Sequence, residues 1–320
     1  MKKKILLIHT GGTISMHTQE SSGAVMPGDQ NPMMAEREKF EDHAEIFEEE
    51  VFNLPSPHIT PAEMFSIRQL INSYRRIRDI DGVVITHGTD TLEETAYFLD
   101  LTLESELPVI LTGAMRTSNE IGSDGVYNLI SALRVAADPE AAGKGVLVVL
   151  NDEIHTAQNV TKTHSSNVST FQSPQYGPIG IVTKNAVRFH HSPMRQEYYN
   201  VEAITKKVML LKVFAGMDGD IVDSAIDLAY DGIVLEGLGQ GNVPPALLPA
   251  VRRAISHDIP VVLVSRCFNG IAQAVYAYPG GGRMLQEEGV IVAHGLSGQK
   301  ARLKLLIGLC NGSDIRRIFS

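Results

Sequence analysis

Cysteines and long apolar runs are scarce in this 320-residue sequence. The two cysteines, Cys267 and Cys310, are far apart, which argues against a disulfide framework or a cysteine-bound metal cluster. No stretch approaches the roughly 20 apolar residues that a membrane-spanning helix needs. After the lysines at 2–4 the apolar run covers only residues 5–8, which is too short for a secretory signal. We therefore expect a cytoplasmic protein that does not enter a membrane.

Positive charge and the common motifs of nucleotide, metal and serine chemistry are also lacking. The 28 Lys and Arg against 37 Asp and Glu give a formal charge of −9, spread along the chain, so nucleic-acid binding is not expected. The sequence has no P-loop and no G-x-G-x-x-G, H-E-x-x-H or G-x-S-x-G string. We expect no metal ion and no cofactor.

Short runs rich in β-branched residues alternate with helix-period segments in the first half of the chain. This alternation favours parallel βαβ units and an α/β layer architecture. One helix has a clear start, because Thr60, Pro61 and Glu63 predict a capping box. Thr91 and Glu94 repeat that pattern. The expected strands are 5–8, 82–86, 108–112 and 146–150, and the expected helices are 65–77, 91–103 and 124–136.

Two irregular segments divide the sequence. Residues 17–34 are polar and aperiodic, which predicts a mobile loop beside the end of the first strand. The sequence again lacks a regular hydrophobic pattern around 186–206. Predicted strands resume at 208–213, 232–236 and 260–265, with a helix-like stretch at 244–256. We therefore expect an N-terminal domain over 1–187, a linker over 188–206 and a smaller α/β domain over 207–320.

Three glycine- and threonine-rich strings follow predicted strands. In a doubly wound sheet, ligands bind outside the carboxyl ends of the strands, so these strings are expected to face one crevice. Thr13 offers a nucleophilic hydroxyl, although a turn or capping role is the commoner explanation for such a threonine taken alone. Asp90 is placed to meet a cationic ligand, unless it or Thr91 only caps the next helix. The strings are 9–15, 86–91 and 112–116.

Lys162 lies in a string of small polar residues after the fourth strand. Such a lysine is usually a solvated surface group. Beside a hydroxyl and a carboxylate, however, its ammonium becomes an acid or base for proton transfer.

Together the strings resemble the bacterial-type L-asparaginase family. The resemblance implies a flavodoxin-like doubly wound N-terminal domain and a second, smaller α/β C-terminal domain. It also implies that L-asparagine is hydrolysed to L-aspartate and ammonia through a threonine nucleophile and an acyl-enzyme intermediate, in a homotetramer built as a dimer of dimers. The strings that carry it are Thr10-Gly11-Gly12-Thr13-Ile14, His87-Gly88-Thr89-Asp90-Thr91, Gly113-Ala114-Met115-Arg116, Ser123-Asp124-Gly125-Val126-Tyr127-Asn128-Leu129 and Val160-Thr161-Lys162-Thr163.

The resemblance assigns roles to individual residues. Thr13 matches the nucleophile position, and Thr89, Asp90 and Lys162 match a second catalytic cluster. Ser56 would hold the substrate α-carboxylate, and Asp90 the α-ammonium. The residues implied to bind substrate are Gly12, Ser56, Gly88, Thr89, Asp90, Ala114 and, from a neighbouring subunit, Asn242.

The sequence departs from the family pattern at two places. The tyrosine often found in the mobile loop is missing from 23–27, and the acidic residue that many glutamine-hydrolysing members carry is missing from 275–278.

Two other functions are possible for this sequence. One is that of a non-catalytic amino-acid sensor. Another is that of the amidase subunit of a tRNA-dependent amidotransferase, which is disfavoured because the first predicted strand begins at residue 5 and leaves no extension to contact a partner.

Overall fold

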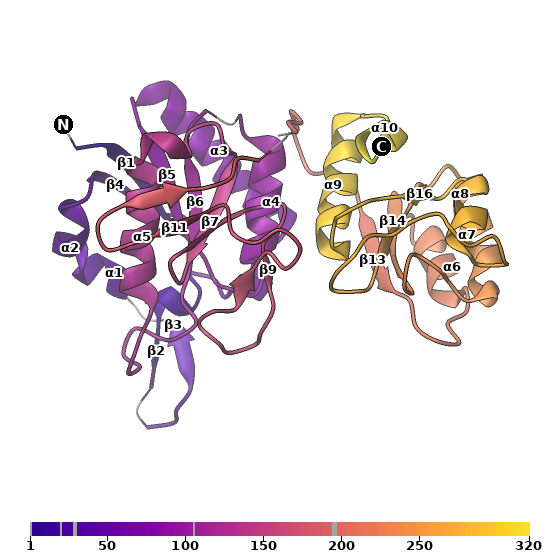
Figure 1. The fold of residues 1–320 in the computed structure, drawn as a ribbon, viewed down its shortest axis with the longest axis horizontal. Coiled ribbons are helices and arrows are strands. Elements are labelled where there is room, and N and C mark those ends of the chain that lie inside the picture. The colour runs from indigo at the N-terminus through magenta and orange to yellow at the C-terminus, as the bar shows by residue number, and fades with distance from the viewer. Residues whose placement is uncertain (1, 20, 28–30, 105, 194–196) are drawn as a thin grey trace. The chain divides into compact units, whose positions relative to one another are not determined.

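A computed structural model of the protein describes residues 2–19, 21–27, 31–104, 106–193 and 197–320 (Figure 1). The chain forms two compact units, Met1–Tyr198 and Tyr199–Ser320, and each is described by itself. No helix within the described ranges is long and apolar enough to cross a membrane.

The first unit is built on an eight-stranded sheet in the order β12-β11-β8-β7-β6-β5-β1-β4. Strands β4, β1, β5, β6 and β7 are parallel, while β8, β11 and β12 pair antiparallel at one side. Numbered along the chain, the parallel strands have the order 2-1-3-4-5, which is the flavodoxin-like order that the resemblance implied. The strands are β1 Lys4–His9, β4 Glu45–Glu50, β5 Gly82–Thr86, β6 Val109–Thr112, β7 Val146–Leu150, β8 Glu153–Thr156, β11 Gly180–Val182 and β12 Val187–Phe189.

Helices cover both faces of this sheet. On one face α5 packs with α1 and α2 against the side chains of Ile5, Val84 and Ile110. Helices α3 and α4 pack against each other outside that cluster, on the opposite face. The chain passes from β5 through α4 to β6, and then from β6 through α5 to β7, in the same direction across the sheet. Because α4 and α5 lie on opposite faces, one of these two βαβ crossovers is left-handed, which is rare. The helices are α1 Pro32–Ala35, α2 Arg37–Glu41, α3 Pro61–Ile77, α4 Leu92–Thr102 and α5 Gly125–Ala137.

The predicted helix starts are only partly correct. The capping box before α3 is confirmed, since the Thr60 N–H donates to Glu63 Oε2 at 2.8 Å. The second capping box is wrong. Thr91 precedes α4 but makes no capping bond, because its hydroxyl instead donates to the carbonyl of Ser56 at 2.8 Å. This hydroxyl therefore ties the helix start to the segment after β4.

The prediction of a loop over 17–34 is wrong for the parts of the described range that form regular structure, whereas residues 19 and 21–24 lie in no helix or strand. Met16–Thr18 (β2) and Val25–Pro27 (β3) form an antiparallel pair, and α1 begins at Pro32. Asn119 holds the end of β2 that leads into the turn, because its side chain bonds both the N–H and the carbonyl of Thr18 at 2.8 Å. Long-range hydrogen bonds of this kind leave no periodic pattern in the sequence. Residues 20 and 28–30 of the predicted loop lie outside the described ranges.

The second unit is a smaller α/β domain, as predicted, and its sheet has four parallel strands. Its apolar core includes Val222, Leu247 and Leu263. The strands are β13 Val208–Lys212, β14 Gly232–Gly237, β15 Val261–Ser265 and β16 Ile291–Val292. The helices are α6 Asp220–Asp227, α7 Leu248–Ser256, α8 Gly282–Glu287, α9 Gly298–Asn311 and α10 Ile315–Ile318.

Candidate functional site

The first two strings meet through their glycines. Gly12 has φ +82°, and a Cβ atom there would lie 2.2 Å from the Cα of Gly88, so only glycine fits at this position. Both strings follow parallel strands, β1 and β5, at their carboxyl ends. Strand β1 lies between β4 and β5, where the strand order reverses. The contact therefore lies at the place where α/β sheets bind ligands, and it is followed on each side by a threonine, Thr13 and Thr89.

Ser56 is brought to the same place by β4. It begins a short 3-10 helix, η2 Ser56–His58, and only 4% of its surface is exposed. Its hydroxyl accepts a hydrogen bond from the N–H of Asp90 at 3.2 Å. A Cβ atom on Gly88 would lie 2.7 Å from the Cβ of Ser56, so the serine rests directly on this glycine. Three strand ends thus contribute to one site.

Lys162 connects the hydroxyl and the carboxylate of the second string. Its ammonium lies 2.9 Å from Oγ1 of Thr89 and 2.6 Å from Oδ1 of Asp90. The Lys162 side chain is 15% exposed, whereas that of Asp90 is 61% exposed. Lys162 belongs to a two-residue strand, β9 Thr161–Lys162, which pairs with β10 Phe171–Gln172 outside the main sheet. The surface-lysine reading is therefore wrong in this structure.

The third string is held rigidly after β6. The carboxylate of Asp124 accepts hydrogen bonds from the N–H groups of Met115 and Arg116, at 3.0 Å each at the closest. Asn128 donates to the carbonyl of Gly113 at 3.0 Å. Ala114 lies between these fixed points and is only 1% exposed.

Several backbone N–H groups in this region are free to meet a ligand, and those of Thr89 and Ala114 are among them. Among the residues that the structure describes, the N–H groups of Thr89 and Ala114 donate to no other group. A buried N–H without a partner is uncommon in folded proteins, so each needs an explanation. Both lie beside a glycine, Gly88 and Gly113, where backbone can approach a ligand closely.

His87 fixes the peptide that carries one of these N–H groups. Its Nδ1 lies 2.8 Å from the carbonyl of Gly88, and its Nε2 lies 2.9 Å from the hydroxyl of Thr95. A carbonyl can only accept, so Nδ1 carries the proton and Nε2 accepts from Thr95. In a trans peptide the next N–H points opposite to the carbonyl. The Thr89 N–H is therefore directed away from His87.

Complete burial lowers the pKa of His87 to about 4, from an ordinary value of 6.5. Between these two pH values the unfolded chain binds more protons than the folded one. We expect the contribution of neutral His87 to stability to be complete above pH 6.5 and to be lost as the pH falls to 4, a change of about 3 kcal/mol. Urea unfolding of wild type and His87→Gln across this range tests this. Equal pH dependence in the two proteins would contradict it.

Two further predicted residues are Thr13, which directly follows Gly12, and Asn242, which belongs to the second unit. Thr13 begins the 3-10 helix η1 Thr13–Ser15, and within the described ranges its hydroxyl has no hydrogen-bond partner. Asn242 belongs to the second unit, where its Oδ1 accepts from the N–H of Gly282 at 3.3 Å. Sequence reasoning missed Glu93, a buried carboxylate on α4 that bonds to β9. An acidic residue in the first turn of a helix is so common that it gave no signal.

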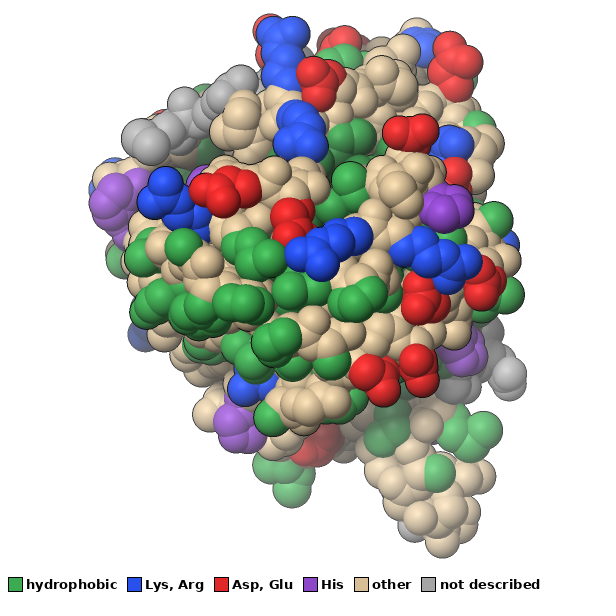
Figure 2. All heavy atoms as spheres, turned by 90° about the vertical axis from the view of Figure 1, so that its right-hand side faces the viewer, with side chains coloured by type: hydrophobic (Ala, Val, Ile, Leu, Met, Phe, Trp, Pro, Cys, Tyr) green, Lys and Arg blue, Asp and Glu red, His purple; other side chains and the backbone are tan. Residues whose placement is uncertain are grey.

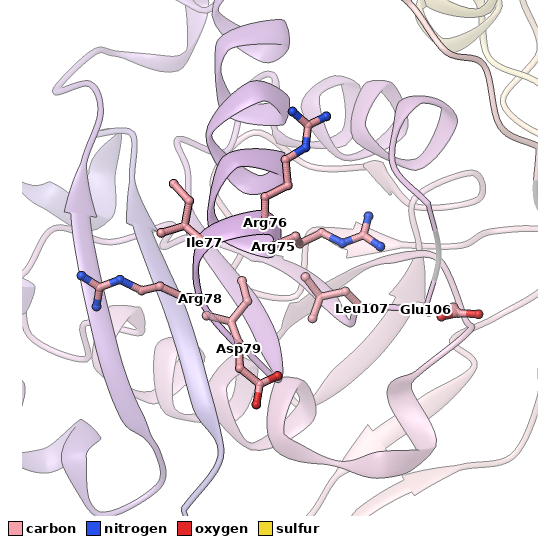
Figure 3. Close-up of a pocket in the computed structure, with 8 residues that line it drawn as sticks. Arg75, Arg76, Ile77, Arg78, Asp79, Glu106 and Leu107 are labelled. Carbon is pink, nitrogen blue, oxygen red and sulfur yellow. The ribbon is translucent and has the colours of Figure 1, made fainter.

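A surface pocket of about 480 Å³ lies elsewhere, between the end of α3 and the starts of β5 and β6 (Figure 3). The starts of these strands are the edge of the sheet opposite to the glycine contact. Arg78 points away from Arg75 and Arg76 in this view and lies over the ring of Phe47. The three guanidinium groups do not converge, so we do not assign a ligand to this pocket. Its lining is Arg75, Arg76, Ile77, Arg78, Asp79, Ile80, Glu106 and Leu107.

Comparison with known proteins matches both halves of the chain. Residues 4–195 match the family model "Asparaginase, N-terminal", and residues 207–319 match "Glutaminase/Asparaginase C-terminal domain". The chain is 41% identical to a probable L-asparaginase of Deinococcus radiodurans, over 99% of this chain and 97% of the other. It is 34% identical to an L-asparaginase of Bacillus licheniformis, over 97% of each. The crystal structure of a probable cytoplasmic L-asparaginase from Campylobacter jejuni matches with a TM-score of 0.89 and 32% identity, over 99% of each chain. The chain therefore belongs to the bacterial-type L-asparaginase family.

Proposed function

We propose that this protein hydrolyses L-asparagine to L-aspartate and ammonia. The observation that carries the proposal is the contact of the Lys162 ammonium with both the Thr89 hydroxyl and the Asp90 carboxylate, beside the Gly12–Gly88 junction. A hydroxyl, a proton carrier and an acidic group within hydrogen-bond reach are what hydrolysis of an unreactive amide requires. Membership of the asparaginase family supports the same reaction.

Thr13 is the nucleophile in this proposal. Its Oγ1 bonds to the amide carbon of the substrate, the carbon–nitrogen bond breaks, and the nitrogen leaves as ammonia after taking up the hydroxyl proton. Water then attacks the resulting ester, releases aspartate and restores the Thr13 hydroxyl. Lys162 and Thr89 carry the protons, because Lys162 Nζ donates to the Thr89 hydroxyl across a contact of 2.9 Å, and this contact provides a path for proton transfer.

The remaining residues bind and orient the substrate. The Ser56 hydroxyl is proposed to hold the α-carboxylate, and the exposed Asp90 carboxylate the α-ammonium. The free N–H groups of Thr89 and Ala114 are suited to stabilise the oxyanion that forms when the amide carbon is attacked. One such donor is worth roughly 3 kcal/mol where it has been measured. Gly12 and Gly88 keep side chains out of this space.

Two other readings are less well supported. A non-catalytic amino-acid sensor has no need of an ammonium held against a hydroxyl, and this contact is present here. No observation on this chain favours an amidase subunit of a tRNA-dependent amidotransferase. The relatives compared above are named as L-asparaginases, and each matches this chain over nearly its whole length.

We also propose a cytoplasmic homotetramer, a dimer of dimers in which Asn242 completes the site of a neighbour. Figure 2 shows apolar side chains gathered on part of the face that it presents. The second unit exposes the large apolar side chains of Phe268, Val275 and Tyr278 by 59%, 54% and 51%, and burial of such side chains is a reason for subunits to associate. Sedimentation at the enzyme concentration used in assays tests the tetramer. An active monomer would contradict it.

The activity itself is tested by ammonia release from L-asparagine and L-glutamine over a wide concentration range. We expect hydrolysis of both with a preference for asparagine, because one extra methylene changes the binding of the transition state by about 1–3 kcal/mol. The missing acidic residue at 275–278 motivates this preference. Equal kcat/KM for the two amides would contradict the preference, and no release from either would contradict the proposed function.

A further inference from the structure

Glu93 is a buried carboxylate that none of the proposed chemical steps uses. It lies in the first turn of α4, three residues after Asp90, and only 6% of its surface is exposed. A buried carboxylate is costly unless hydrogen bonds compensate for the water it has lost. The hydrogen-bond partners of Glu93 therefore indicate its role in the structure.

Two of these partners belong to the strand that carries Lys162. Glu93 Oε1 accepts a hydrogen bond from the hydroxyl of Thr161 at 3.0 Å and another from the backbone N–H of Lys162 at 3.2 Å. One oxygen atom thus holds both residues of β9. Both bonds span almost 70 positions of the sequence, 68 and 69 respectively.

Strand β9 needs such an anchor. It is two residues long, pairs only with the equally short β10 among the described strands, and is not part of the eight-stranded sheet. A pair of this length is not stable by itself in water. The position of the Lys162 backbone therefore depends on groups outside the pair, and Glu93 binds that backbone directly.

We propose that Glu93 is a positioning residue for Lys162. Helix α4 begins directly after Thr89, Asp90 and Thr91, so Glu93 attaches β9 to the helix that immediately follows the hydroxyl and the carboxylate. Its two hydrogen bonds to β9 fix the backbone from which the Lys162 side chain extends. From that position the ammonium reaches Thr89 and Asp90. The inference rests on the proposed function insofar as Lys162 carries protons there, but the geometry it concerns is independent of the substrate.

The test compares Glu93→Ala and Glu93→Gln with Asp100→Ala as a matched control. Asp100 lies on the same helix, and its carboxylate also accepts from a strand N–H, that of Val146 at 2.8 Å, but at the far end of α4. We expect Glu93→Ala to lower kcat on the order of 10²-fold, as for a misplacement of about 1 Å, with little change in KM. Glu93→Gln keeps an accepting oxygen and should restore most of the activity. Asp100→Ala should change stability but not kcat.

A second readout does not depend on turnover. Limited acetylation followed by peptide mass spectrometry measures how accessible the Lys162 amine is relative to other lysines. We expect labelling of Lys162 to rise in Glu93→Ala and to stay near the wild-type level in Glu93→Gln and Asp100→Ala. If wild type released no ammonia but showed this labelling pattern, the proposed function would fail while the positioning role would stand.

If Glu93→Ala does not fold, Thr161→Val provides an alternative test of the same hydrogen bonds. It removes one of the two bonds with almost no change in shape, and a typical hydrogen bond is worth about 1 kcal/mol, so we expect kcat to fall roughly 3- to 10-fold. Unchanged kcat and unchanged Lys162 labelling in the folded variants would overturn the proposal. Equal impairment of Glu93→Gln and Glu93→Ala would overturn it as well.

Discussion

Lys162→Met is expected to lower kcat by roughly 10²–10⁴-fold, the range attributed to a positioned acid or base. Methionine has a similar length but no proton to move, so it leaves the Thr89 hydroxyl without its partner at 2.9 Å. The fold should persist, because the Asp90 side chain is 61% exposed and water can replace the lost ammonium. Ammonia release under saturating asparagine, together with the midpoint of thermal unfolding, measures both effects.

Lys3→Met is the matched control for this substitution. Lys3 also pairs with an aspartate, Asp81 at 2.7 Å, but it lies beside the amino end of β1, at the edge of the sheet opposite to the glycine contact. Removing this exposed ion pair should leave kcat unchanged. If Lys162→Met kept kcat within tenfold of wild type while remaining folded, Lys162 would not carry protons in the reaction.

Thr13→Ala is expected to have the largest effect, a loss of about 10⁴-fold or more in kcat, since removal of a nucleophile ends covalent catalysis. Binding of aspartate should hardly change, because Ser56 and Asp90 remain and the Thr13 hydroxyl makes no hydrogen bond to another described residue. Calorimetric titration with aspartate separates binding from chemistry. Thr13→Ser keeps a hydroxyl and should retain part of the activity, whereas full activity in Thr13→Ala would exclude this threonine as nucleophile.

Much of the fold follows from local pattern. The buried parallel strands appear in the sequence as continuous β-branched runs, because a parallel sheet covered on both faces needs apolar side chains in every direction. Strand β4 escaped prediction because it contains Glu45, Glu48, Glu49 and Glu50, residues that are unfavourable in strands. It is an edge strand, where charged side chains are tolerated. The strand that precedes Ser56 in the chain, β4, is therefore the one that lacks a recognisable hydrophobic pattern.

The sequence suggests residues for the candidate site, but it does not indicate the groups that hold them in place. Glycines and threonines at strand ends, together with the family resemblance, indicate Thr13, Thr89 and Asp90. The groups that fix them lie far away in sequence or look ordinary. Thr91 resembles a helix cap, yet its hydroxyl bonds Ser56, 35 positions away. Glu93 resembles a first-turn acid, yet it holds β9. Such roles arise from tertiary contacts that no local pattern encodes.

Rapid quenching of the wild-type enzyme with a slowly hydrolysed asparagine analogue, followed by digestion and mass spectrometry, tests the central claim most directly. If the Thr13 hydroxyl attacks the amide carbon while Thr89 and Lys162 transfer protons, the aspartyl mass must appear on the peptide that contains Thr13, and Thr13→Ala must abolish it. An adduct on the peptide that contains Thr89, with none on the Thr13 peptide, would contradict this division of roles.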